Sequence, residues 1–289
     1  MMKKHEQDLN ANAERRNIPE GNRQSNVDRF SGYQDTYDRY RPEAPEQVID
    51  ILTGYLQRKP ALVVDIGCGT GLSSYVWKNA ADRIIGIEPN DDMRQKAIDK
   101  LQEQERTDHI SFIAGYSNQI PLDSESVDII TCSQSFHWME PASTLKEAAR
   151  LLCTGGIFAV YDCDWPPSLH WPIEKTCHEL IESAEMLINK HIEDDRKARK
   201  GNKNEHLKHI RESGLFRFAK EIVFHHMEPC NAERYVGLTL SQGGIQTLFR
   251  HGIHELDSAI DAFIQQVEAY FQGQPREVMF SYRLRLGIK

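Results

Sequence analysis

A strand-like run that breaks into three alternating glycines constrains the fold of this chain most. Residues 61–66 form a short, mostly apolar run that is rich in β-branched side chains, and this pattern predicts a buried strand. Gly67, Gly69 and Gly71 follow at alternate positions. Because glycine adopts positive φ angles and carries no Cβ, the backbone of this turn can approach a ligand closely. Helical periodicity from Leu72 predicts a helix whose N-terminal amides point at that ligand.

The spacing of the glycines separates this loop from a dinucleotide-binding loop. That fingerprint is Gly-x-Gly-x-x-Gly, whereas the residue three positions after Gly69 is Leu72. A second apolar strand is predicted at 84–87 and ends in Glu88. In a parallel sheet this acid lies beside the glycine loop, where its two oxygens can accept both hydroxyls of a ribose. The structural alternative for the glycine loop is an ordinary strand-to-helix turn. The structural alternative for Glu88 is a solvated position at the start of the next helix.

Five successive motifs resemble those of class I S-adenosylmethionine-dependent methyltransferases. They are VDIGCGTG (64–71), GIEPN (86–90), FIAGYSNQIPL (112–122), VDII (127–130) and the run 152–161. Within that class the chain is most similar to the trans-aconitate methyltransferase-like group, because of FHW at 136–138 and the upstream pattern Tyr37-x-x-Tyr40-Arg41-Pro42-x-x-Pro45. The resemblance covers about residues 30–165. It implies a Rossmann-like α/β fold with a mostly parallel seven-stranded sheet, an antiparallel last strand and a helical insertion.

The resemblance implies S-adenosylmethionine as the cofactor and S-adenosylhomocysteine as its product. Met93, at the head of a helix predicted over 91–102, is suited to packing on adenine, although it also fits ordinary core packing. Many relatives carry an acid for the adenine amino group where this chain has Tyr116-Ser117, so Ser117 becomes the candidate. The candidate cofactor-binding residues are Tyr37, Asp65, Gly67, Gly69, Gly71, Glu88, Pro89, Met93, Ser117 and Ser133.

The methyl acceptor is expected at the same edge of the sheet. The predicted fourth strand, 127–132, delivers His137 and Trp138 to its carboxyl end, where ligands of open α/β sheets bind. His137 is the catalytic candidate, as a base or as a group that orients the acceptor; the alternative is a purely structural histidine. In the resembled group the N-terminal segment folds over the cofactor, so Tyr37 or Tyr40 would cover the sulfonium and Arg41 would pair with an acidic acceptor. The candidate acceptor-binding residues are Tyr40, Arg41, His137 and Trp138.

Composition indicates a soluble globular protein. Hydrophobic residues make up 39 % of the chain and charged residues 27 %, and no apolar stretch approaches the length of a membrane span. The net charge of −8 disfavours general attraction to nucleic acid. We expect a cytoplasmic protein, a monomer or homodimer, whose six cysteines are reduced and structural. The histidines lack recognisable metal-ligand spacing, so no metal site is predicted.

The chain is predicted to divide into three parts. Residues 1–29 are polar and predict a flexible arm. Residues 30–165 and 216–289 form the methyltransferase core, with a sixth strand at 220–224 and an alternating closing strand near the end. Residues 166–215 form a helical insertion that caps the substrate.

Two alternatives to a small-molecule methyltransferase stay open. The segment 190–211 carries eight Lys or Arg residues against four Asp or Glu, which is typical of a solvated face but also suits RNA or an anionic substrate. An RNA or protein methyltransferase would use this patch. A regulator that binds the cofactor without catalysis is the other alternative, since function resides in the site rather than in the fold.

Overall fold

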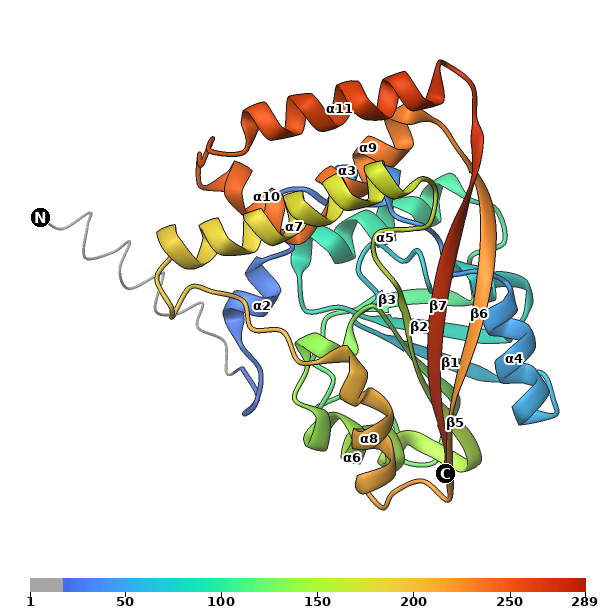
Figure 1. The fold of residues 1–289 in the computed structure, drawn as a ribbon. Helices are drawn as coiled ribbons and strands as arrows, with labels where there is room; N and C mark the ends of the chain where they lie inside the picture. The colour runs from blue at the N-terminus through green and yellow to red at the C-terminus, as the bar shows by residue number, and fades with distance from the viewer. Residues whose placement is uncertain (1–17) are drawn as a thin grey trace, which may run out of the picture.

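The computed structural model describes residues 18–289 and is built around one seven-stranded sheet (Figure 1). The strand order is β3-β2-β1-β4-β5-β7-β6. The first five strands pair in parallel, and β7 lies antiparallel between β5 and β6. The strands are β1 (Leu62–Ile66), β2 (Arg83–Ile87), β3 (Ile110–Ile113), β4 (Val127–Ser133), β5 (Leu152–Cys163), β6 (Phe218–Cys230) and β7 (Arg276–Ile288). The predicted Rossmann-like methyltransferase fold is confirmed.

The side chains of the central strands feed two hydrophobic cores, one on each face of the sheet. Val63 and Ile84 belong to one core, whereas their chain neighbours Val64 and Ile85 belong to the other. This follows from the period of two along a strand, and explains why these strands read as continuous apolar runs. The first core is covered by α4 (Gln47–Leu56), α5 (Asp91–Glu103) and α7 (Trp171–His191), the second by α6 (Pro141–Leu151) and α8 (His206–Glu212).

The helix predicted to begin at Leu72 is not an α-helix. Turns follow the glycine loop, and then a short 3₁₀ helix, η1 (Tyr75–Asn79). Serine, tyrosine, valine and tryptophan dominate this stretch, and none of them is a strong helix former. The expected anion-binding helix N-terminus beside the loop is therefore wrong.

Helices that cap the sheet come from two segments rather than one. The segment between β5 and β6 carries α7, η3 (Lys203–Glu205) and α8. A second segment, between β6 and β7, carries α9 (Ala232–Leu240), α10 (Gly243–Arg250) and α11 (Asp257–Phe271); α10 and α11 pack on α7 (Figure 1). The cap is thus larger than the predicted 166–215 insertion. The division into functional domains remains a prediction.

The N-terminal segment is folded from residue 18 onward. The helices α2 (Gln24–Asp28) and α3 (Gln34–Tyr40) precede the core, and α2 lies in the described part of the predicted flexible arm, residues 18–29, where Asn26 is buried. The remainder of that arm, residues 1–17, lies outside the described residues. Within residues 18–289, none of the helices has both the length and the apolar character needed to cross a bilayer. The six cysteines are free thiols, and five of them are buried.

Two glycines provide a matched test of the packing. A Cβ on Gly86 in β2 would meet the Phe112 ring and lie 2.7 Å from the Cys68 sulfur, whereas a Cβ on Gly54 in α4 would meet no atom within 4 Å. Gly86→Ala should therefore destabilise the fold by about 1–3 kcal/mol through overpacking. Gly54→Ala should stabilise it by about 0.5–1 kcal/mol, because helical glycine is entropically costly. Urea unfolding measures both; equal effects would contradict this packing.

Candidate functional site

The glycine loop after β1 adopts the backbone conformation that the sequence predicts. Gly67, Gly69 and Gly71 all have positive φ angles, of 68°, 56° and 84°. A Cβ on Gly67 would lie 2.6 Å from the Ser135 Cβ, whereas a Cβ on Gly69 would meet nothing within 4 Å. Gly67 is thus needed for packing, and Gly69 faces open space that a ligand can enter.

Asp65 holds the loop in place from behind. Its carboxylate is fully buried and accepts hydrogen bonds from the hydroxyls of Ser73 (2.6 Å), Ser74 (2.7 Å) and Thr131 (2.9 Å). Burial raises the pKa of Asp65, and the three hydroxyl donors oppose that rise. Asp65 therefore connects β1 to β4 and to the turn, and it does not line a cavity.

A first cavity lies between the glycine loop and the N-terminal helices. Eight of the ten predicted cofactor-binding residues line it: Tyr37, Gly67, Gly69, Glu88, Pro89, Met93, Ser117 and Ser133. Asp65 and Gly71 do not; Gly71 packs so tightly that a Cβ there would lie 2.8 Å from the Tyr75 ring. These two predicted contacts are corrected to structural roles. Contact of the other eight with a cofactor remains a prediction.

Glu88 places its carboxylate in this first cavity at the end of β2. One oxygen accepts the N–H of Gly69 at 2.9 Å, and the other accepts the N–H of Asn90 at 2.8 Å. Burial raises the pKa of Glu88 to about 7, and the two backbone donors oppose this shift. Because a carboxylate offers about four acceptor positions, each oxygen can accept one further hydrogen bond.

Asn26 fastens the N-terminal segment over the site. This buried side chain donates to the backbone oxygens of Trp138 (2.9 Å) and Arg199 (3.0 Å), and accepts the N–H of Arg199 at 2.7 Å. Asn90 holds the same segment from α5 by donating to the Val27 oxygen at 3.0 Å. Three segments far apart in the sequence therefore meet above the cavity.

A second cavity adjoins the first and is rich in positive charge; we call it the cationic cavity. Its positively charged lining residues are Arg29, Arg41, Lys200 and Lys203, and the only acidic side chain among the described residues that line it is Glu185; His137 lines it as well. Four residues line both cavities: Phe30, Tyr37, Gln134 and Trp138. A ligand in the first cavity would therefore lie next to a ligand in the cationic cavity.

The adjacent residues Arg41 and Tyr40 place their side chains in different sites. The Arg41 guanidinium lies between the rings of Tyr37 (5.2 Å) and Trp165 (4.9 Å) in the cationic cavity. Tyr40 points away, and its hydroxyl donates to Glu233 at 3.1 Å in an exposed groove. The prediction that Tyr40 contacts the acceptor is therefore corrected. Tyr40 is the last residue of α3, and Arg41 follows it in an extended conformation, so the two side chains leave the backbone in different directions.

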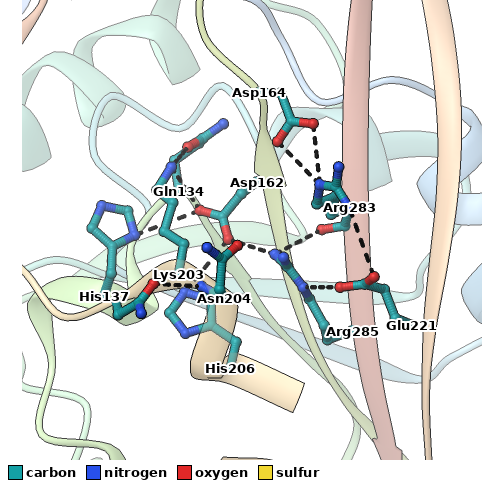
Figure 2. Close-up of polar contacts among 11 residues, drawn as sticks. Gln134, His137, Asp162, Asp164, Lys203, Asn204, His206, Glu221, Arg283 and Arg285 are labelled. Atoms are coloured by element: carbon teal, nitrogen blue, oxygen red, sulfur yellow. Dashed lines mark hydrogen bonds and ion pairs between the residues drawn. The ribbon is translucent and has the colours of Figure 1, made fainter. Parts of the chain in front are cut away.

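His137 lies in the 3₁₀ helix η2 (Phe136–Trp138) just after β4, and it is 5 % exposed. Its Nδ1 faces the Asp162 carboxylate at 3.5 Å, and Figure 2 shows Asp162 at the centre of a wider ionic network. Lys203 lies 3.0 Å from one Asp162 oxygen, and Arg285 donates to the other at 3.1 Å. Burial lowers the pKa of His137 to about 3, and Asp162 opposes this shift. The imidazole is therefore neutral at pH 7.

Among the described residues, one group of side chains is compact enough to raise the question of a metal ion. The atoms of His137, Asp162 and His206 that could act as ligands lie within 4.8 Å of one another. Lys203 and Arg285 already contact Asp162, so an added cation would meet two resident positive charges. The electrostatics favour an ionic network over a metal centre.

Sequence reasoning missed Gln134, which lines both cavities. It has a φ of 53°, uncommon for a residue with a side chain, and its amide oxygen accepts from Lys203 at 2.7 Å. Its place just after β4, at the carboxyl end of the sheet where ligands bind, is the sequence feature that could have indicated this role. Asp162 and Lys203 were also missed, because their roles depend on contacts between segments far apart in the sequence.

Comparisons with known proteins agree with this architecture. Residues 64–160 match the family described as "Methyltransferase domain". An uncharacterized methyltransferase of Mycobacterium bovis, Mb3374, is 33 % identical over 42 % of this chain and 46 % of its own length. The probable S-adenosylmethionine-dependent methyltransferase CRG1 of Saccharomyces cerevisiae is 23 % identical over 56 % of each chain.

A solved structure shows the same fold over a longer stretch. Phosphoethanolamine N-methyltransferase 2 of Haemonchus contortus, in complex with phosphomonomethylethanolamine and S-adenosylhomocysteine, has a TM-score of 0.53 and 13 % identity, over 91 % of this chain and 60 % of that one. The sequence matches span about half the length of the two relatives named above. The stretch 64–160 is therefore similar to methyltransferase domains. It contains the glycine loop, Glu88 and His137, but neither Arg41 nor Lys203.

The raised pKa of Glu88 predicts a pH dependence of stability. An acid whose pKa is raised on folding contributes stability that is fully present below its ordinary value of 4.5 and is lost as the pH rises through about 7. As the pH falls from about 8 to about 5, the wild type should therefore gain up to about 3 kcal/mol relative to Glu88→Gln. Chemical unfolding of both proteins measures this gain, with the exposed Glu103→Gln as control. A constant difference would contradict the burial of Glu88.

Proposed function

We propose that this chain transfers the methyl group of S-adenosylmethionine to a small anionic acceptor. The junction of the two cavities at Tyr37, Gln134 and Trp138 carries the proposal. The first cavity has the glycine loop and an acceptor of ribose hydroxyls, and the cationic cavity next to it suits an anion. Binding both ligands at once would align the methyl group with its acceptor.

The residues of the first cavity fit the cofactor. Glu88 has acceptor capacity left for the two ribose hydroxyls, and Gly69 leaves open space beside it. Met93 is buried at the head of α5, where it can pack on the adenine ring. The Ser117 hydroxyl is engaged with the Thr144 hydroxyl at 2.7 Å, which leaves the Ser117 backbone as the more suitable adenine contact.

Catalysis would come mainly from alignment and from exclusion of water. When bound, the cofactor supplies a methyl group already activated by the positive sulfonium. Tyr37 and Trp138 line the junction, and Phe30 packs edge-on against both at ring-centre distances of 6.4 and 5.8 Å. These rings would shield the methyl group and face its charge. Holding two reactants in line can supply about 7–11 kcal/mol of the barrier.

The charge of the cationic cavity supports an anionic acceptor. Arg41 makes no ion pair with an acid of the described residues; its Nη2 donates to the Ser241 backbone oxygen at 3.0 Å, and its Nε is buried without a partner. Burial lowers the pKa of Lys200, with Lys203 adding to the shift. An anionic group on the acceptor would relieve both costs. The resemblance to the trans-aconitate methyltransferase-like group points to the same chemistry, an acceptor that carries a carboxylate.

The alternative of an RNA or protein methyltransferase is less well supported. Most basic side chains of the segment 190–211 are already paired, and they do not form a free cationic surface. The pairs are Lys190–Glu255, Arg196–Glu193, Lys197–Asp194, Arg199–Asp194 and Lys203–Asp162. A non-catalytic regulator would bind the cofactor at the same cavity without turnover, and the experiments below separate that case.

Cofactor affinity should depend on Glu88. Glu88→Ala removes the acceptor of both ribose hydroxyls and should cost about 1.5–3 kcal/mol, or roughly tenfold to a hundredfold in affinity. The wild-type affinity should also fall as the pH drops through about 7, because protonation removes acceptor capacity. Calorimetry with S-adenosylhomocysteine measures both effects, with Asp99→Ala on the exposed face of α5 as control. Unchanged affinity in Glu88→Ala would remove the ribose assignment.

Acceptor turnover should depend on Arg41 and not on its neighbour Arg39. With methyl-labelled cofactor and a fractionated metabolite extract, label should move into small anionic molecules. Arg41→Met should raise the acceptor KM roughly tenfold to a hundredfold through loss of a charged hydrogen bond, with cofactor affinity unchanged. Arg39→Met is the control, because that exposed side chain pairs with Glu233. Cofactor binding without any transfer would favour the regulator.

A further inference from the structure

We propose that Asp162 is a positioning residue that fixes the proton of His137 on Nδ1, so that the reacting group of the acceptor is one that carries an O–H or N–H. The inference rests on the proposed methyl transfer and specifies the acceptor atom. Its basis is the contact of His137 Nδ1 with Asp162 at 3.5 Å, between side chains that are only 5 % and 3 % exposed.

Asp162 is held in its ionised form by several neighbours. Lys203 lies 3.0 Å from Oδ1, Arg285 donates to Oδ2 at 3.1 Å, and the His206 Nε2 lies 3.5 Å from Oδ2. Burial by itself would raise the pKa of Asp162, but His137 and Lys203 together keep it below its ordinary value. Arg285 also donates a hydrogen bond to the Glu221 carboxylate at 2.7 Å, and this second acid balances part of the positive charge.

An ionised carboxylate beside Nδ1 determines the tautomer of a neutral imidazole. A lone pair on Nδ1 would face the negative oxygen, whereas an N–H there is attracted to it. The proton therefore belongs on Nδ1, and Nε2 carries the lone pair. In Figure 2 the second ring nitrogen of His137 points away from Asp162, and His137 lines the cationic cavity. Within the described part of the chain, neither ring nitrogen of His137 makes a hydrogen bond, so the 3.5 Å approach of Nδ1 to Asp162 is an electrostatic contact between two buried atoms that have no hydrogen-bond partner.

A lone pair on Nε2 selects the group that it can face. A hydroxyl or an amine can donate a hydrogen bond to it, whereas an ionised carboxylate has no hydrogen to donate. Arg41 and Lys200 supply the positive charge that an anionic group needs, in the same cavity. The acceptor therefore has two functions: an anionic group held by the cations and an O–H or N–H directed at His137.

The proton balance of the transfer is complete with these groups. The bond from sulfur to the methyl carbon breaks, and its electron pair stays on sulfur. A lone pair of the acceptor oxygen or nitrogen forms the new bond to carbon. A hydroxyl becomes strongly acidic as this bond forms, so its proton can move to His137 Nε2 although burial lowers the pKa of that ring to about 3, and it then passes to water. A methylated amine releases its proton to water after the transfer.

The tautomer can be measured in the wild-type protein without a known substrate. Two-bond ¹⁵N–¹H NMR correlations of ¹⁵N-histidine-labelled protein distinguish the two neutral tautomers and the imidazolium, and His137→Gln assigns the signal by its absence. We expect a neutral ring with the proton on Nδ1 at about pH 7. A proton on Nε2, or an imidazolium, would overturn the proposal even if methyl transfer is established.

Asp162→Asn tests the role of Asp162 directly. The carboxamide can donate to Nδ1, so the proton should move to Nε2, and kcat should fall roughly 10²-fold or more while cofactor affinity stays unchanged. Arg283→Gln is the matched control: Arg283 is the cross-strand partner of Asp162 between β5 and β7, but its side chain pairs with Asp164 at 3.1 Å and not with the Asp162 carboxylate. If Asp162→Asn keeps the tautomer and kcat of the wild type, Asp162 has no positioning role.

The product gives an independent answer about the acceptor atom. Methyl ethers and methylamines survive mild alkali, whereas methyl esters are hydrolysed. Label retained in the anionic product after alkali supports an O–H or N–H acceptor. Label released as methanol would overturn the inference and leave the proposed methyl transfer intact. Absence of transfer to any fraction would overturn the proposed function, while the NMR result would still decide the tautomer.

Discussion

The architecture of the site depends on one buried carboxylate, Asp65. It accepts three hydroxyl hydrogen bonds at the point where β1 ends, and so joins β1, β4 and the turn that follows the glycine loop. A buried charge is costly unless its oxygens are satisfied, so the three donors must stay in place together. This requirement fixes the loop and sets where Gly69 and Glu88 meet. Asp65 thus acts on the ligand site through the backbone, although it does not touch the cavity.

A second buried carboxylate, Asp162, joins the elements around the cationic cavity, as Asp65 joins those around the glycine loop. It receives Lys203 from the helical cap and Arg285 from β7, so it couples the cap to the strands β5 and β7 (Figure 2). Buried ion pairs often contribute little net stability, because desolvation offsets the attraction, but they specify one arrangement among several. The position of Lys203, and with it one wall of the cationic cavity, is specified in this way. Asn26 then fastens the N-terminal segment to the same wall.

The sequence predicted the parts of the molecule that local patterns encode. The strands, the positive-φ glycines and Glu88 at the end of β2 follow from periodicity, turn chemistry and parallel pairing. The η1 turn was missed because weak helical periodicity was weighted above poor helix propensity. Tyr40 was misplaced because α3 ends at Tyr40 and the backbone is extended at Arg41, which turns the two side chains in different directions. Asp162 and Lys203 are 41 residues apart and meet only in the folded chain, so no local pattern indicates their contact.

The same distinction between local and distant contacts explains why the match to the family is confined to one stretch, residues 64–160. The first cavity is built mostly from a contiguous stretch, the glycine loop to Trp138, and this stretch lies within the matched residues 64–160. The cationic cavity takes Arg41 from before that stretch and Lys200, Lys203 and Gln242 from after it. A cofactor shared by many enzymes constrains the first set of residues, whereas each acceptor constrains only the second. Similarity over 64–160 therefore covers the first cavity, where we propose that the methyl donor binds. The acceptor must be inferred from the charges and the histidine tautomer of the cationic cavity, since function resides in the site rather than in the fold.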